Sequence, residues 1–266
     1  MKKRNDSKIT MAALMMMAAM AMTSCASSKK INNDSNASKS SEMGKNEEDL
    51  DNSYLVLSDT QQDIVKKNNA FALRLFNKVT DMESKVISPM SVSYLMGMLA
   101  NGADGITQQE ILKAIGCEGV SVSDLNELYK AMLLNANHQD KQTTVNIANY
   151  IAVNKNFKLD KNFCQQVSDS YQAGIESLDF TSSKSTDRIN GWCKEKTNGM
   201  IPRIIDQVSA DAVSYLMNAI YFKGTWQNKF NAKDTKLENF RGYTRDIQKV
   251  EMMHQVKKLF YTENKD

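Results

Sequence analysis

The sequence predicts an α+β fold, because helical patterns fill its first half and strand patterns dominate its last third. Apolar residues recur with helical spacing in several segments up to residue 137, and at every second position in several later ones. The two kinds of pattern do not alternate regularly, which argues against a doubly wound parallel sheet. With 266 residues and 41% hydrophobic content, the chain can bury the core of one large domain or two modest ones.

The first two predicted helices lie within residues 68–102. Residues 68–79 place Phe71 and Val79 on one apolar face. Ser88 suits an N-cap and Pro89 suits a first helical position, so a second helix is expected from there to Gly102. That helix is apolar on nearly all sides, which is typical of a helix buried in a core.

Two further helices are predicted between residues 107 and 137. Thr107 and Glu110 match the capping-box pattern, so a third helix is expected to begin there and to end near Gly116. Residues 124–137 predict a fourth, amphipathic helix.

The middle of the chain mixes strands and helices. Residues 143–156 predict a strand with period-two spacing, and residues 175–180 predict a short one. Asp160 is expected to cap a helix over 161–171, and a helix over 189–199 is expected to end in a left-handed turn. The face of the long strand carries Val145, Ile147, Ile151 and Val153, and the left-handed turn is expected at Asn198 and Gly199.

A strand is predicted over residues 213–224, and it contains an asparagine within an apolar run. The stretch LMNAIYFKGTW places Asn218 on the same face as Leu216 and Ile220. A buried amide is costly unless its polar atoms find partners, so Asn218 is expected to be hydrogen-bonded. Two more strands are predicted over residues 244–256 and 257–263.

The N-terminus predicts an exported protein. A basic segment precedes the apolar residues 9–22, which are too few to span a membrane, so residues 1–24 are expected to be a signal peptide. The sequence MTSC resembles a bacterial lipobox, so Cys25 is expected to be lipidated and to anchor the protein to the membrane at the cell envelope or surface. A secretory signal that happens to carry a cysteine is the alternative. Residues 25–59 are polar and predict a flexible tether.

Composition and motifs argue against several classes of function. The net charge of +3, with basic residues scattered among acidic ones, does not favour nucleic-acid binding. Cys117, Cys164 and Cys193 lack a CxxC spacing and are interpreted as buried small residues. The two histidines, His138 and His254, are far apart, so neither a zinc site nor another cofactor is expected. The chain has no GxSxG, HExxH or glycine-rich phosphate loop, so it is not expected to be an enzyme.

Three motifs resemble the serpin family, the serine protease inhibitors. They begin at Ile87 (ISPMSVSYLMGMLANGADGITQQEI), at Ile189 (INGWCKEKTNGMI) and at Leu216 (LMNAIYFKGTWQNKF, running on to DTKLENF), in the family's order. The resemblance implies an α+β serpin fold with many helices and a large central sheet, of which residues 60–266 form the N-terminal portion. It also implies inhibition of serine or cysteine proteases. In inhibitory members a reactive loop is cleaved by the target, forms an acyl-enzyme and inserts into the sheet as an extra strand.

The resemblance assigns structural roles to five residues. Ser88, Pro89 and Ser91 match the start of the buried helix beneath the sheet, in the region called the shutter, and Asn218 matches the shutter asparagine on the strand above. Trp226 matches the tryptophan of the breach, where the loop begins to enter. No residue is expected to be catalytic. A hydrogen-bonded cluster of amide and hydroxyl groups is expected to hold the sheet in one arrangement.

The sequence departs from the family pattern after residue 266, where the reactive loop would follow. Two hypotheses remain open: the chain is the N-terminal part of a membrane-tethered protease inhibitor, or it is a truncated, non-inhibitory module that binds or associates at the membrane. In either case the strand that carries Asn218 would present a long apolar edge, which favours association.

Overall fold

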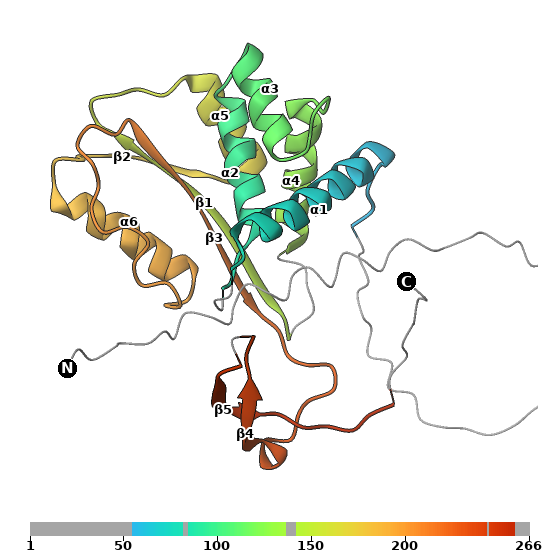
Figure 1. The fold of residues 1–266 in the computed structure, drawn as a ribbon. Helices are drawn as coiled ribbons and strands as arrows, with labels where there is room; N and C mark the ends of the chain where they lie inside the picture. The colour runs from blue at the N-terminus through green and yellow to red at the C-terminus, as the bar shows by residue number, and fades with distance from the viewer. Residues whose placement is uncertain (1–54, 82–84, 137–141, 244, 259–266) are drawn as a thin grey trace, which may run out of the picture.

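A three-stranded sheet with helices on both faces forms the centre of the computed structural model (Figure 1). The structure describes residues 55–81, 85–136, 142–243 and 245–258. The helices are α1 (Asp59–Val79), α2 (Pro89–Asn101), α3 (Gly105–Ala114), α4 (Val122–Ala136), α5 (Lys161–Tyr171), α6 (Ser183–Lys196) and the short 3₁₀ helix Ala232–Asp234. The strands are β1 (Thr144–Asn154), β2 (Gly174–Leu178), β3 (Ser214–Lys223), β4 (Lys236–Arg241) and β5 (Ile247–Met252).

The strand order in the main sheet is β2-β1-β3. Strand β2 runs parallel to β1, whereas β3 runs antiparallel to it, with Thr144 opposite Lys223 and Val153 opposite Ser214. Strands β4 and β5 form a separate antiparallel pair, which lies beyond the end of the main sheet (Figure 1). The mixture of helices and sheets confirms the α+β prediction.

Each face of the main sheet covers its own hydrophobic core. On one side, Ile151 and Val153 of β1 pack with α1 to α5, and Leu216 of β3 packs against the same cluster. On the other side, Tyr150 of β1 and Met217 of β3 pack with α6. Because side chains alternate along a strand, the period-two pattern correctly predicted which residues share a face.

Helix α1 begins earlier than the predicted segment 68–79. The Ser58 side chain accepts a hydrogen bond from the Gln61 backbone, and the Gln61 side chain accepts one from the Ser58 backbone. This capping box starts the helix at Asp59, although few apolar residues follow at once. Leu57 also packs against the first core, so the folded part begins before the predicted boundary at residue 60.

The predicted start of α3 at Thr107 is wrong. Asp104 is the N-cap, and its carboxylate accepts a hydrogen bond from the Gly105 backbone at 2.7 Å. The side chain of Gln108 accounts for the start of α3 after Asp104. Its amide donates to the carbonyl oxygens of Ala100 and Ala103, and these hydrogen bonds hold α3 against the end of α2. The helix still ends near Gly116, as predicted.

The later elements agree with the sequence in kind but not always in extent. Helix α6 begins six residues before Ile189, because Ser182 caps it, and Asn198 and Gly199 adopt the predicted left-handed conformation. Strand β4 was not predicted, because its mostly polar residues show no regular alternation of apolar and polar side chains. Strand β5 confirms part of the predicted segment 244–256. Of the predicted strand 257–263, the first two residues are not in a strand and the rest lie outside the described residues.

Several predictions concern residues that the structure does not describe. The signal peptide (1–24), Cys25, most of the tether and His138 all lie outside the described residues. Within the described ranges, no helix is both long and apolar enough to cross a membrane.

Replacing Ser58 with alanine should destabilise the folded domain by about 1 kcal/mol, because the backbone of α1 loses its N-terminal hydrogen-bond acceptor. Urea unfolding followed by circular dichroism would measure this change. The control is Thr60→Ala, since Thr60 is exposed on the same helix and plays no part in the cap. Equal stability of the two variants would contradict the role of the capping box.

Candidate functional site at the edge of β3

A cavity of about 330 Å³ lies against β3, between that strand, α1 and the start of α2. Of the residues predicted for the site, Ser88, Pro89, Ser91 and Asn218 all line this cavity, whereas Trp226 does not. Most of the remaining wall is apolar and includes Val65, Ala72, Met90, Met132 and Ile220. The fold therefore brings the predicted shutter residues together from α2 and β3, which are more than 120 positions apart in sequence.

The serine hydroxyls at the start of α2 bond to each other. Ser88 is in an extended conformation, and its hydroxyl oxygen accepts hydrogen bonds from the Ser91 backbone at 3.2 Å and from the Ser91 hydroxyl at 2.9 Å. Pro89 occupies the first turn, where its missing N–H leaves no donor unsatisfied. These serines therefore cap the buried helix.

Asn218 bonds to another asparagine, and not to the serines. Its amide nitrogen donates to the side-chain oxygen of Asn149 at 2.8 Å, and the two residues lie directly opposite each other on β3 and β1. Asn149 is 3% exposed, and its own amide donates to the Tyr171 carbonyl at 2.7 Å. The predicted cluster of amide and hydroxyl groups is thus wrong in its partners, because the pairing of β1 with β3 places the two amides side by side.

Sequence reasoning missed Asn149, although a signal for it was present. In the predicted strand 143–156, the apolar face carries Ile147 and Ile151, and the position between them on that face is Asn149. A polar residue at the centre of an apolar face usually indicates a buried hydrogen bond.

The side-chain oxygen of Asn218 is buried and has no hydrogen-bond partner among the described residues. In that part of the chain no strand pairs with the outer edge of β3, so its outward N–H and C=O groups are also unpaired within the sheet. A buried acceptor without a donor costs about 1 to 3 kcal/mol. The edge of β3 is therefore ready to accept both a strand and a side-chain donor.

A polar network beneath β1 holds α2, α4 and α5 together. The Tyr171 hydroxyl donates to Asn126 at 2.8 Å, and Asn126 exchanges hydrogen bonds of 2.8 and 2.9 Å with Asn101. Burial raises the pKa of Tyr171, so the phenol stays neutral and keeps its proton for this bond. A methyl group at Gly97 would lie 2.4 Å from the Tyr171 oxygen, so the close packing of α2 on α5 requires glycine there.

Two of the three described cysteines are buried, as predicted, and Cys164 is half-buried. Burial raises the pKa of Cys117 to about 11, and burial also raises the pKa of Cys193. Both thiols therefore remain protonated at neutral pH. Within the described ranges, no group of three or more histidine, cysteine or acidic side chains could hold a metal ion.

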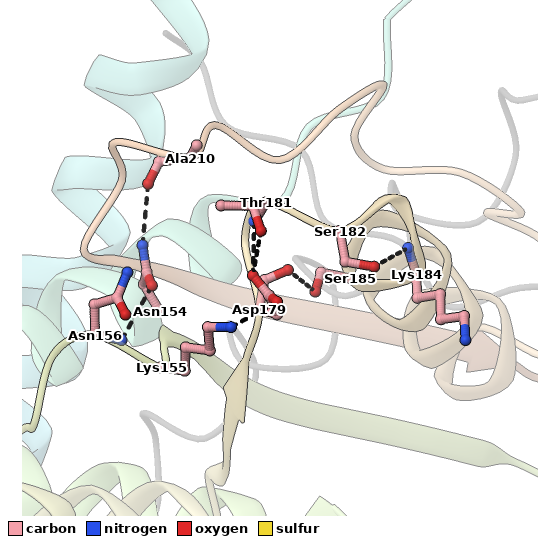
Figure 2. Close-up of polar contacts among 9 residues, drawn as sticks. All are labelled: Asn154, Lys155, Asn156, Asp179, Thr181, Ser182, Lys184, Ser185 and Ala210. Atoms are coloured by element: carbon pink, nitrogen blue, oxygen red, sulfur yellow. Dashed lines mark hydrogen bonds and ion pairs between the residues drawn. The ribbon is translucent and has the colours of Figure 1, made fainter.

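Figure 2 shows the contacts that fix the ends of β1 and β2 and the start of α6. The Asn154 amide donates to the Ala210 carbonyl at 3.1 Å, which holds the loop before β3 against β1 (Figure 2). The Asp179 carboxylate pairs with Lys155 at 2.7 Å and accepts a bond from the Thr181 hydroxyl at 2.6 Å (Figure 2). These bonds, first that from Lys155, lower the pKa of Asp179 to about 2.

Trp226 lies three residues beyond the end of β3. Its ring is 49% exposed and contacts Phe230 edge to face, with 5.5 Å between the ring centroids. This position is at the end of the strand, as the resemblance implies.

Comparison with known proteins decides the family. The family profile for serpins, described as serine protease inhibitors, matches residues 66–266. The chain belongs to the serpin family. It is 32% identical over 206 residues to the leukocyte elastase inhibitor of Bos taurus, which covers 75% of this chain and 54% of that serpin. It is 30% identical over 186 residues to serine protease inhibitor 42Dd of Drosophila melanogaster, covering 69% and 50% of the two chains.

Solved serpin structures share the fold. The latent state of the thermophilic serpin tengpin matches 74% of this chain and 53% of its own, with a TM-score of 0.66 and 33% identity. Reactive-loop-cleaved human thyroxine binding globulin matches 74% and 60%, with a TM-score of 0.69 and 26% identity. The chain thus spans about half the length of the serpins that it matches.

Replacing Asn218 with alanine should destabilise the domain by about 1 kcal/mol, because the hydrogen bond from its amide to the buried oxygen of Asn149 is lost. Thermal unfolding would show a lower melting temperature. Asn162→Ala is the matched control, since Asn162 is an exposed asparagine of α5. An unchanged melting temperature for Asn218→Ala would contradict a bonded amide at this position.

Replacing Asp179 with asparagine should destabilise the domain at pH 6, and the difference should shrink as the pH is lowered. The pKa of Asp179 is lowered from its ordinary 3.8 to about 2, so the carboxylate stabilises the fold above pH 4 and loses this effect as the pH falls through 2. Melting temperatures of both proteins across this range would test the prediction. Asp187→Asn is the control, because Asp187 is exposed on α6 and makes no ion pair among the described residues. A difference as large at pH 2 as at pH 6 would contradict the assignment.

Proposed function

We propose that this chain supplies the strand-accepting part of an inhibitor of serine or cysteine proteases. The observation that carries the proposal is the open edge of β3, which lies over an apolar cavity and holds the buried, unpartnered oxygen of Asn218. Family membership and the inhibitors among the relatives support this reading.

The open edge suits the insertion of a strand. A segment that pairs with β3 would gain a row of main-chain hydrogen bonds, as in other cases of strand addition. Its side chains on the inner face would fill the cavity beside Ile220, and a donor among them would satisfy Asn218. In inhibitory serpins the inserted segment is the cleaved reactive loop.

The segment that a protease would cleave is expected in the half of the relatives that this chain does not match. We therefore assign the receiving sheet and its supporting helices to the folded part of this chain, and the reactive loop that selects the protease to the part of the relatives that this chain does not match. The target remains a serine or cysteine protease defined by that loop.

The N-terminal pattern supports an inhibitor held at the cell envelope or surface. A lipidated Cys25 would anchor the domain to the membrane, and the polar residues after it would let the domain reach a protease nearby. Incorporation of a labelled fatty acid into the wild-type chain, but not into Cys25→Ser, would test this part.

A chimera tests the inhibitory function directly. Residues 1–258 of this chain, followed by the matching second half of tengpin, should form a covalent, denaturant-resistant complex with a serine protease on a gel. The 266-residue chain alone should form none. The control chimera carries a proline in the inserting part of the loop, where the lost N–H prevents strand pairing, and it should be cleaved without trapping the protease. A folded chimera that behaves only as a substrate would contradict the proposal.

A further inference from the structure

We propose that the bond between Asp104 and Gly105 is a site of spontaneous covalent modification, at which Asp104 converts to isoaspartate and α3 loses its N-cap. The reaction uses only water and groups of the chain itself. It therefore goes beyond protease inhibition and does not depend on it.

The modification is a rearrangement of the main chain. The Gly105 nitrogen attacks the side-chain carboxyl carbon of Asp104, and a C–N bond forms. One water molecule leaves, made from the proton of that nitrogen and the hydroxyl of the carboxyl group, and a five-membered succinimide ring remains. A second water molecule then opens the ring at either carbonyl. The products are aspartate and isoaspartate, so the chain keeps its mass and no oxidant or reductant takes part.

Four bonds in the sequence have the composition that favours this reaction, because a following glycine leaves the attacking nitrogen unhindered. At asparagine, ammonia leaves in place of water, and an amide closes the ring more readily than a carboxyl group. Without a fold, the three asparagines would therefore react before the aspartate. The four bonds are Asn101–Gly102, Asp104–Gly105, Asn190–Gly191 and Asn198–Gly199.

The fold engages the attacking nitrogen at the three asparagine sites. The Gly102 nitrogen donates to the Leu99 carbonyl at 3.0 Å, and the Gly199 nitrogen donates to the Lys194 carbonyl at 2.7 Å. Gly191 lies inside α6, where its N–H belongs to the hydrogen-bond ladder of the helix. Ring closure at these sites must first break a main-chain hydrogen bond, so the fold protects them.

Two of the asparagine side chains are held in place as well. The Asn190 amide donates to the Ile205 carbonyl at 2.9 Å, and its oxygen accepts a bond from the Ile204 backbone at 2.8 Å. The Asn101 amide donates to the Gly97 carbonyl at 2.8 Å. Rotation of either side chain toward the following nitrogen would break these bonds.

At Asp104 the attacking nitrogen is held beside the group that it attacks. Gly105 is the first residue of α3, so its N–H has no acceptor within the helix. It donates instead to the carboxylate of Asp104 at 2.7 Å. Both residues are exposed among the described residues, and a methyl group at Gly105 would have no atom within 4 Å, so the ring has room to form. Holding two reacting groups together lowers the entropy cost of their reaction.

Isoaspartate at position 104 would remove the N-cap of α3. The modified residue adds one carbon to the main chain, which displaces its carboxylate from the Gly105 nitrogen. The hydrogen bonds of Gln108 to Ala100 and Ala103 hold the same turn against the end of α2, so they would be strained as the turn shifts. The domain should therefore melt at a lower temperature after modification.

Identical chemistry at four positions tests protection by the fold. The full 266-residue chain with Asp104→Asn has four asparagine–glycine bonds and keeps a capping side chain, since asparagine also caps helices. The protein is stored at neutral pH in a mild detergent, with and without urea, and mass spectrometry of its peptides measures deamidation at each position. Without urea, position 104 should react roughly tenfold faster than the other three, because only there is the nitrogen held beside the side chain. In urea the four rates should become similar.

Storage of the unaltered chain tests the modification itself. Isoaspartate should accumulate at position 104, where electron-transfer fragmentation of the peptide distinguishes it from aspartate, and the melting temperature should fall as it accumulates. Asp104→Ser is the control, because serine caps a helix but cannot form the ring. The melting temperature of this variant should stay constant during storage.

Any of three results would overturn the proposal. The first is a rate at position 104 that is no faster than the rates at the other three positions without urea. The second is an unaltered chain that forms no isoaspartate at position 104 during storage. The third is isoaspartate without a fall in melting temperature, since the cap would then survive. These measurements use no protease, so their failure is distinct from a failure of the chimera to trap one.

Discussion

The pairing of β1 with β3 is the interaction on which the rest of the structure depends. It joins two strands separated by the whole of α5, β2 and α6, and its ten aligned residues divide the interior into two cores. Helices α1 to α5 cover one face of the pair and α6 covers the other (Figure 1). Asn149 and Asn218 lie opposite each other within this pairing, so their hydrogen bond reports its register. A slip of one residue between the strands would leave the two amides on opposite faces of the sheet.

Among the described residues, the same pairing leaves β3 with one paired edge and one open edge. The function proposed for this chain uses the open edge to receive an inserted strand, because its row of N–H and C=O groups can pair with one further strand.

Local sequence signals predicted the kinds of most elements and several of their ends. Ser88 and Pro89 act within one turn of α2, and Asn198 and Gly199 terminate α6, so their effects could be predicted from short stretches. The errors also have physical causes. Helix α3 begins after Asp104 and not at the capping box predicted at Thr107, because the Gln108 amide donates hydrogen bonds to carbonyl oxygens at and just after the end of α2. At α1, a capping box at Ser58 starts a helix whose first turns carry little apolar surface.

The sequence by itself determined the α+β class and the face of β3 on which Asn218 lies, because these depend on local pattern. The family resemblance predicted that Ser88 and Asn218 belong to one site, and both line the same cavity. Only the tertiary structure decided which partner Asn218 has. Its amide bonds to Asn149, 69 positions earlier in the chain, and not to the hydroxyl groups of α2. Hydrogen bonds between distant residues depend on strand register and on how helices pack beneath the sheet, and neither can be predicted from residue spacing alone.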